Sequence, residues 1–196
     1  MNELHTLKII KEDILRIISE KGGKDTLDGI KEEIKTSNFF VSEAVKELER
    51  DKLIRPQQNF FELTGKGEKK ARDILRKHST IETYFGKTKD KQKAHEIAHI
   101  LEHNISEEVI ENIRKLSALK ERGTSLLGFK PSKDLLITDI DIPDDKLFER
   151  MISMGIFPGE KIKIVNEAPN SIIVEIRNKK FAIDKSIAKE IKVIKL

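Results

Sequence analysis

The sequence predicts an α+β protein with three consecutive folded parts. Apolar residues recur at helical spacing through the first two parts, and short apolar runs separated by Pro, Gly and Asn turns fill the last. The first pattern indicates amphipathic helices and the second indicates short strands. We therefore expect a domain of helices and a hairpin at residues 1–73, a helical domain at 74–120, a linker at 121–133 and a small β-barrel at 134–196.

Composition limits the classes of protein to consider. The chain has 196 residues, of which 37% are hydrophobic, enough to bury two or three small cores. It has no cysteine, which excludes disulfides, thiolate metal ligands and a cysteine nucleophile. It has no long apolar run and no signal-peptide layout, so we expect a cytoplasmic protein without a membrane span. The net charge of +4 is small, so any affinity for DNA must come from local arrangement.

The N-terminal part predicts a helix-turn-helix. Residues 8–20 and 26–35 each show helical spacing, and residues 39–52 do so again after a polar turn at 36–38. Three helices with a tight turn before the last one are typical of a helix-turn-helix. Strands at residues 53–63 with a central Pro-Gln-Gln-Asn turn then predict a wing.

A winged helix-turn-helix places its third helix, the recognition helix, in the major groove of DNA. The candidate DNA contacts are Ser37, Asn38, Phe39, Phe40, Ser42, Glu43 and Lys46. The alternative is a three-helix core without a DNA function. Basic side chains after the wing are further candidates for phosphate contacts, although a solvated helix face is the commoner explanation for such a run; they are Lys66, Lys69, Lys70, Arg72, Arg76 and Lys77.

Two of the middle helices carry an unusual concentration of metal-ligating residue types. Four of the five histidines and three glutamates fall between Arg76 and His103, namely His78, Glu82, His95, Glu96, His99, Glu102 and His103. Positions i and i+4 lie about 40° apart around a helix, so His78 shares a face with Glu82, and the later histidines share a face with Glu102. Glu96 points elsewhere. Imidazole and carboxylate together suit a divalent transition metal.

The helices that carry these residues have recognisable boundaries. Thr64 is the expected N-cap of a long helix ending near Phe85, and a second helix covers residues 94–103. Ser106 caps a third helix, at residues 107–119. Its apolar face is larger than one short bundle needs, so we expect part of it to form a homodimer interface; the face comprises Val109, Ile110, Ile113, Leu116 and Leu119.

The C-terminal part predicts a small β-barrel. Its five expected strands are residues 135–140, 161–166, 171–177, 180–183 and 191–194, and one helix is expected at 144–154. The barrel contains no histidine and no obvious catalytic pair.

With these parts assembled, the chain resembles the diphtheria toxin repressor (DtxR/MntR) family of metal-dependent transcriptional regulators along nearly its whole length. The motifs that carry the resemblance are VSEAVKELERDKLI, LTGKGEKKARDILRKHSTIE and AHEIAHILEHNISEEV, with DKLFERMISMGIFPGEKIKIV and VEIRNKKFAIDKSIAKEIKV similar to the FeoA pattern. The resemblance implies a winged helix-turn-helix, a helical dimerisation and metal-binding domain and a FeoA-like barrel. It implies a homodimer that binds a palindromic operator in double-stranded DNA, with no small-molecule substrate, and that represses metal-uptake genes.

The resemblance also implies two metal sites. Those residues that match the ancillary site are His78, Glu82 and His95, and those that match the regulatory site are His99, Glu102 and His103. The family takes one more regulatory ligand from the first helix, here Asp13, with the adjacent Glu12 as the alternative. The barrel can lend ligands too, and its unranked candidates are Glu149, Glu160, Glu167 and Asp184.

The chain departs from the family pattern at two places. His99 stands where iron-type members have Cys and manganese-type members have Glu. The barrel accompanies iron-responsive members, so the expected metal is Fe(II), with Mn(II) second and Zn(II), Co(II) or Ni(II) as further binders. Phe39, Phe40 and Glu43 stand where the family has small polar residues and Gln. They could contact thymine methyls and cytosine, or the two phenylalanines could be partly core and DNA binding weakened.

Two other functions are consistent with parts of the sequence. One is a metal-independent winged-helix regulator whose histidine cluster is structural. The other is a metallohydrolase, because HEIAH matches the HExxH string of zinc peptidases, with Glu96 as the candidate base. We discount the hydrolase because a third zinc ligand of that class and a substrate-binding strand are missing, and we expect no enzyme.

Overall fold

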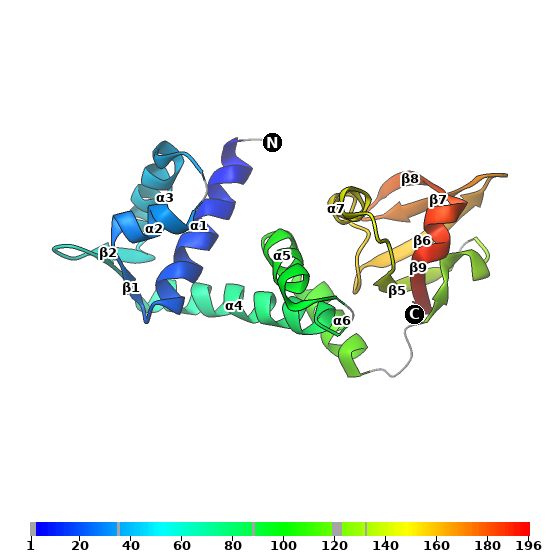
Figure 1. Ribbon diagram of the computed structural model, residues 1–196, viewed down its shortest axis with the longest axis horizontal. Coiled ribbons are helices and arrows are strands. Elements are labelled where there is room, and N and C mark those ends of the chain that lie inside the picture. Colours follow the sequence, from blue (N-terminus) through cyan, green and yellow to red (C-terminus); the bar gives the residue numbers. More distant parts are fainter. Residues whose placement is uncertain (1–2, 35, 88, 119–122, 132) are drawn as a thin grey trace. The chain divides into compact units, whose positions relative to one another are not determined.

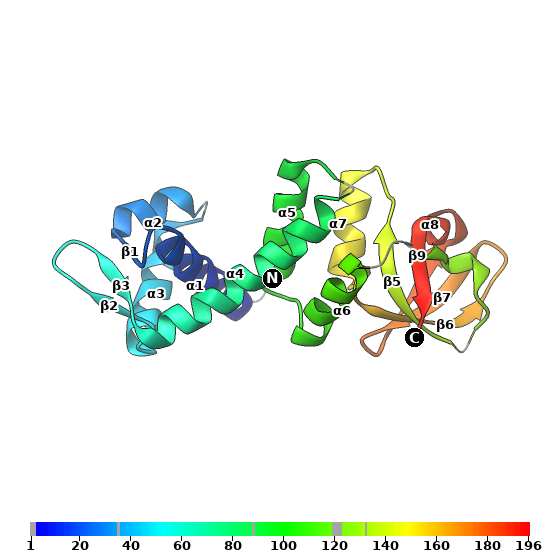
Figure 2. The same ribbon diagram turned by 90° about the horizontal axis from the view of Figure 1, so that it is seen from below.

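The structure is a computed structural model that describes residues 3–34, 36–87, 89–118, 123–131 and 133–196 (Figures 1 and 2). The chain divides into two compact units, Met1–Asn104 and Ile105–Leu196, and each is described by itself. The first is helical with a small sheet and the second is built on a larger sheet, so the predicted α+β class is confirmed.

Three helices open the first unit: α1 (Glu3–Glu20), α2 (Leu27–Glu33) and α3 (Asn38–Arg50). The Thr26 hydroxyl accepts a hydrogen bond from the N–H of Gly29 at 3.0 Å and caps α2. The apolar stripes predicted from the sequence meet in one core, which includes Ile10, Ile14, Ile18, Ile30, Val41, Ala44 and Leu48. This packing confirms the predicted helix-turn-helix and fixes α1 and α3 to one another.

The predicted wing is present and has a third strand. Strands β2 (Ile54–Pro56) and β3 (Phe61–Leu63) are antiparallel, and β1 (Lys24–Asp25) pairs with the other edge of β3. Strand β1 has only two residues, too few for an alternating pattern, and it was therefore missed in the sequence.

A long helix, α4 (Gly65–Phe85), leads from the wing to α5 (Lys91–Glu102), and the two pack side by side (Figure 2). The predicted N-cap is confirmed, because the Thr64 hydroxyl accepts a hydrogen bond from the N–H of Gly67 at 3.1 Å. Gly67 is required here, since a Cβ would overlap the Leu53 carbonyl. Helix α5 ends at His103, so the chain turns at the last of the clustered histidines.

The second unit begins with α6 (Glu107–Ala118) and continues into a six-stranded antiparallel sheet of order β4-β9-β5-β6-β7-β8. The strands are β4 (Thr124–Ser125), β5 (Asp134–Ile140), β6 (Lys161–Glu167), β7 (Ser171–Ile176), β8 (Lys179–Asp184) and β9 (Ile191–Lys195). The helices that accompany them are the 3-10 helix η1 (Leu126–Gly128), α7 (Asp145–Ser153) and α8 (Lys185–Glu190). All five predicted strands and α7 are present.

Part of the stretch predicted as a linker belongs to the barrel. Thr124 and Ser125 pair with β9, and Leu126 is fully buried. The Gly and Pro residues of this stretch indicated a linker, and a single buried residue such as Leu126 produces no periodic pattern in the sequence. Helix α8 was also missed, because six residues are too short for a helical stripe to emerge. Residues 121, 122 and 132 of the expected linker lie outside the described residues.

Helix α6 packs against the start of β6 within this unit. The Asn112 side-chain amide donates to the Gly159 carbonyl at 2.9 Å, and Glu108 pairs with Lys161 at 2.7 Å. A Cβ on Gly159 would come within 2.8 Å of Ile113. The barrel therefore covers part of the apolar face that the sequence predicts as a dimer interface. Among the described helices, none is both long and apolar enough to cross a bilayer.

Candidate metal centre

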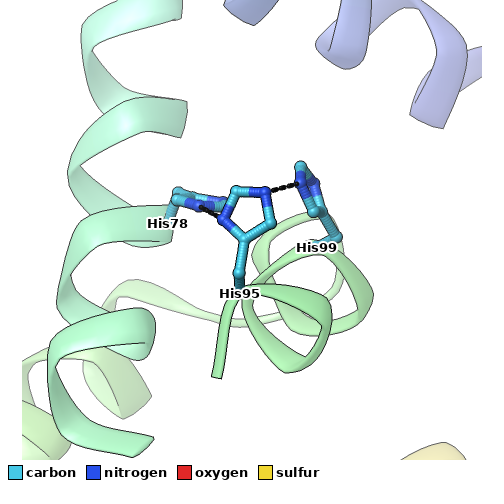
Figure 3. Close-up of side chains that lie close together, drawn as sticks. All are labelled: His78, His95 and His99. Atoms are coloured by element: carbon cyan, nitrogen blue, oxygen red, sulfur yellow. Dashed lines mark hydrogen bonds between the residues drawn. The ribbon is translucent and has the colours of Figure 1, made fainter. Parts of the chain in front are cut away.

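The first group of donor atoms lies between α4 and α5, and we call His78, Glu82 and His95 site 1. His78 Nε2 lies 3.2 Å from His95 Nδ1. Of the two Glu82 carboxylate oxygens, one lies 3.3 Å from His78 Nε2 and the other lies 3.4 Å from His95 Nδ1. Figure 3 shows the ring of His78 reaching from α4 toward His95 on α5. The i, i+4 spacing on α4 explains why His78 and Glu82 reach the same point.

These separations suit a bound metal. Donor atoms about 2.1 Å from a common ion lie roughly 3.0–3.4 Å from one another in octahedral or tetrahedral geometry. Two imidazoles and one carboxylate are also a donor set that holds Fe(II) and other divalent transition metals. The residues present in site 1 therefore fit a metal in both chemistry and spacing.

His99 lies between the two groups of ligands. Its Nε2 is 3.0 Å from His95 Nε2, and its Nδ1 is 3.3 Å from an oxygen of Glu102. The rings of His78, His95 and His99 contact one another, with centroids 4.5–4.9 Å apart (Figure 3). The resemblance grouped His99 with Glu102 and His103, whereas the structure brings it into contact with site 1 as well.

The second group, which we call site 2, contains Asp13 from α1 with Glu102 and His103 from the end of α5. His103 Nε2 lies 3.3 Å from an oxygen of Asp13 and 3.3 Å from Oε1 of Glu102. The side chains of Glu102 and His103 are buried. These separations are again those of ligands on one ion, so site 2 also fits a metal.

Asp13 and Glu12 contact opposite nitrogens of the same ring. Glu12 accepts a hydrogen bond from Nδ1 of His103 at 2.9 Å, while Asp13 faces Nε2. A carboxylate on one imidazole nitrogen fixes the tautomer and leaves the other nitrogen for a metal. The two adjacent acids, which the sequence could not separate, thus occupy positions suited to different roles. Lys8 donates to the His103 carbonyl at 3.0 Å and adds another link from α1 to α5, which sequence reasoning missed.

Glu102 connects the two sites through its two oxygens. One oxygen accepts a hydrogen bond from His78 Nδ1 at 2.8 Å, and the other lies near His99 and His103. Burial by itself would raise the pKa of Glu102, but hydrogen bonds from His78 and His99 and the charge of His103 lower it to about 2. The contact of His78 Nδ1 with this carboxylate leaves His78 Nε2 facing site 1.

The ring of His103 is protonated in the metal-free protein at neutral pH. Burial by itself would lower its pKa, but hydrogen bonds to Asp13 and Glu12 and the nearby charges raise the pKa of His103 to about 9. Positive charge therefore sits among the carboxylates of site 2 before any metal arrives, and binding of a metal at Nε2 requires release of that proton.

If HEIAH were the zinc-binding motif of a hydrolase, Glu96 would be its general base. His78 does bring a third imidazole to His95 and His99. However, the Glu96 side chain hydrogen-bonds Gln92 and pairs with Lys93 at the exposed surface of α5.

The residues predicted to contact DNA lie at the start of α3. Phe39 is 68% exposed, whereas Phe40 is half-buried and packs against the three-helix core. Glu43 and Lys46 pair with each other at 2.7 Å, and Ser37 and Asn38 are exposed. Of the two phenylalanines, one is thus partly core and the other is available to a partner.

Three of the four barrel carboxylates have other roles in the second unit. Glu160 is buried against Arg177 at 2.6 Å, Glu167 pairs with Lys185 at 2.7 Å, and Asp184 caps α8. Glu149 is exposed.

Comparison with known proteins agrees with this architecture. Residues 64–119 match the family model for the metal binding and dimerisation domain of iron-dependent repressors, and residues 124–195 match the FeoA domain. The first match contains His99 and every member of sites 1 and 2 except Asp13. Among curated proteins, none matches the chain.

Several solved structures align with this chain over nearly the full length of both chains. The structure of the metal-dependent transcriptional regulator MtsR is 21% identical, with 95% of this chain and 98% of that chain covered and a TM-score of 0.50. The manganese regulator SloR is 24% identical over 95% and 98%, with a TM-score of 0.49. IdeR from T. acidophilum is 22% identical over 100% and 99%, with a TM-score of 0.44.

The two matched family models adjoin one another and together cover more than half of the chain, and the helix-turn-helix precedes them in the expected order. Residues 64–119 therefore belong to the metal binding and dimerisation domain of iron-dependent repressors and residues 124–195 to the FeoA domain, and this order behind a helix-turn-helix is that of the diphtheria toxin repressor family.

Proposed function

We propose that this protein is a homodimeric repressor that binds a palindromic operator in double-stranded DNA when a divalent metal, Fe(II) in the first place, occupies site 2. The observation that carries the proposal is the position of Asp13. It lies on α1, which packs with the recognition helix α3, yet it faces His103 at the end of α5. A metal shared by these side chains would join the DNA-binding helices to the α4–α5 pair.

Each side chain of site 2 has a distinct task in this account. Asp13, Glu102 and His103 supply donors, and Glu12 holds the His103 ring with Nε2 toward the other two. A divalent ion at this point supplies the charge that holds two carboxylates and one imidazole together. Asp13 then fixes α1, and through the shared core α3, relative to α5.

Fixing α3 matters because the two recognition helices of a dimer must enter successive major grooves about 34–36 Å apart. When the helices sample many positions, the competent fraction falls and the apparent affinity for DNA falls with it. The coupling is reciprocal, so operator DNA tightens metal binding by the same factor.

Fe(II) is our first candidate for the metal and Mn(II) the second. The nitrogen and oxygen donors of both sites exclude any preference based on sulfur, and the two imidazoles and one carboxylate of site 1 match a common Fe(II) ligand set. Zn(II), Co(II) and Ni(II) should bind in the test tube as well, because imidazole affinity follows the usual divalent order.

Direct reading of DNA would fall to the exposed start of α3. Phe39 offers an apolar surface for a thymine methyl, while Glu43 can accept from cytosine if its pair with Lys46 opens. The exposed Lys66, Lys69 and Lys70 at the start of α4 are suited to phosphate contacts, since they lie directly after the wing.

Dimerisation would use the helical region, in line with the description of the matched domain. Ile100 on α5 is an exposed large apolar side chain and is our candidate for the centre of the interface. Closed two-fold association would place equivalent copies of this side chain around one axis.

A binding titration tests the proposal. An operator is selected from a random DNA library with the metal-loaded full chain, and its affinity is measured by fluorescence anisotropy with Fe(II) under anaerobic conditions, with Mn(II), and with a chelator. We expect each metal to raise affinity at least about 100-fold, which corresponds to about 2.7 kcal/mol. Equal affinity with chelator would instead support a metal-independent regulator with a structural histidine cluster.

A further inference from the structure

Arg16 lies on α1 beside site 2 and has contacts on two sides. On one side its terminal nitrogen Nη1 donates to both oxygens of Glu20, at 3.1 and 3.0 Å. On the other side its Nε lies 3.7 Å from Oε1 of Glu102, and its Nη2 lies 3.8 Å from an oxygen of Asp13. The guanidinium thus faces two of the three groups of site 2.

The contacts toward site 2 are charge contacts without hydrogen bonds. Arg16 Nε is buried and has no hydrogen-bond partner among the described residues, although a carboxylate oxygen lies just outside hydrogen-bonding distance. A buried N–H group without a hydrogen-bond partner costs free energy. The position of the Arg16 side chain must therefore be stabilised by another contact. Here the holding contact is the pair of bonds to Glu20, whose side chain is 43% exposed.

The same carboxylate oxygens that face Arg16 would receive a metal. A fixed positive charge a few ångströms away repels a divalent cation, and the repulsion is strong because Glu102 is fully buried and poorly screened.

We propose that Arg16 lowers the metal affinity of site 2 by competing with the ion for Asp13 and Glu102, and that Glu20 weakens this competition by keeping the guanidinium away from those two carboxylates. The proposal rests on site 2 being the metal site of the proposed function. Competition by Arg16 raises the metal concentration at which site 2 fills, and so raises the concentration at which the regulator responds.

A purely structural role for Arg16 predicts the opposite effect. If Arg16 served to orient the two carboxylates, its removal would loosen site 2 and weaken metal binding. Competition predicts that removal tightens it. The sign of the change in metal affinity therefore separates the two roles.

The test measures Mn(II) binding to the full chain by the loss of the electron paramagnetic resonance signal of free Mn(II). A His95→Ala background removes site 1 so that one site is titrated. We expect Arg16→Gln to lower the dissociation constant about tenfold, and Arg16→Lys to leave most of the competition in place. Glu20→Gln should raise the constant a few-fold, because the guanidinium is then free to approach Asp13 and Glu102.

The double variant separates release of Arg16 from the simple loss of a negative charge. In the Arg16→Gln background, Glu20→Gln should change the dissociation constant by less than about twofold, since no guanidinium remains to be released. Arg72→Gln is the matched control, an exposed arginine paired with a glutamate one turn away on α4, and it should leave the constant unchanged.

Each outcome decides a different claim. Absence of Mn(II) binding in the His95→Ala background itself overturns the proposed site 2. Binding there, with unchanged or weaker affinity after Arg16→Gln, overturns only the competition. If Arg16→Gln fails to fold, Glu20→Gln at its exposed position still decides, because unchanged or tighter binding in that variant contradicts the inference.

Discussion

The two candidate metal sites are linked through the hydrogen bond between His78 and Glu102, and both take a donor from α5, yet they differ in exposure and in what they connect. In site 1 the His95 side chain is 50% exposed, and all three donors lie on α4 and α5. In site 2 the Glu102 side chain is fully buried, and one donor comes from α1. A metal in site 1 would join two helices that a short connection already joins.

A metal in site 2 would join segments about 90 residues apart, as the contact between His103 and Glu12 shows. Closing a long loop restricts the chain more than closing a short one. A metal in site 2 therefore restricts the position of the recognition helix more than a metal in site 1 does. Site 1 is better suited to stabilising site 2, through the hydrogen bond between His78 and Glu102.

The largest expected effect comes from Asp13→Ala. This change removes the only α1 donor of site 2, so metal stimulation of operator binding should fall by about 100-fold or more in the anisotropy titration. His95→Ala is the matched change in site 1 and should cost no more than about tenfold. Equal losses in the two variants would contradict the division of roles between the sites.

Glu12→Gln should have the next largest effect. The residue orients His103 without facing Nε2, and loss of such a partner typically costs about 10–100-fold in metal affinity. Calorimetry with Mn(II) should show the loss at one site while the other keeps its affinity. If Glu12→Gln abolished binding and Asp13→Asn did not, Glu12 would be the ligand and our assignment would be reversed.

His99→Ala tests whether the sites are separable. Its two nitrogens face His95 and Glu102 respectively, so removal should weaken Mn(II) binding at both sites by about tenfold each. A loss confined to one site would assign His99 to that site alone.

The smallest effect concerns the stability of the metal-free protein. The raised pKa of His103 gives a contribution that is fully present below pH 6.5 and is lost as pH rises toward 9, and the lowered pKa of Glu102 gives one that is present above pH 4.5 and is lost as pH falls toward 2. Urea unfolding should therefore show a loss on the order of 1–2 kcal/mol across each range. His103→Gln should abolish the alkaline limb and also reduce the acid limb, because the charge of His103 helps to lower the pKa of Glu102; a persisting alkaline limb would place its origin elsewhere.

Local patterns predicted most of the fold. The spacing of Ile10, Ile14 and Ile18, the cap at Thr64 and the end of α4 at Phe85 depend on neighbouring residues, and all were predicted. Strand β1 and helix α8 have too few residues for a period to appear. Their formation depends on partners distant in the sequence.

The candidate site was predictable only as far as helix faces go. Spacing places His95 and His99 on one face of α5, but only the packing of α4 on α5 brings the ring of His78 against both of them. Glu12 and Asp13 are neighbours in the sequence and reach opposite nitrogens of one ring, which no pattern reveals. Arg16 was missed, although its position one turn after Asp13 was a usable signal.

The most direct measurement is the distance between the two recognition helices of the proposed dimer. The chain has no cysteine, so Arg50→Cys at the exposed end of α3 carries one spin label per protomer, and double electron–electron resonance gives the distance distribution. With chelator, we predict a broad distribution of distances. Addition of Zn(II), with no Mn(II) present, should narrow it to a single distance. In the Asp13→Ala variant, addition of Zn(II) should leave the distribution broad. An unchanged distribution on addition of metal would contradict the claim that site 2 positions the DNA-binding helices.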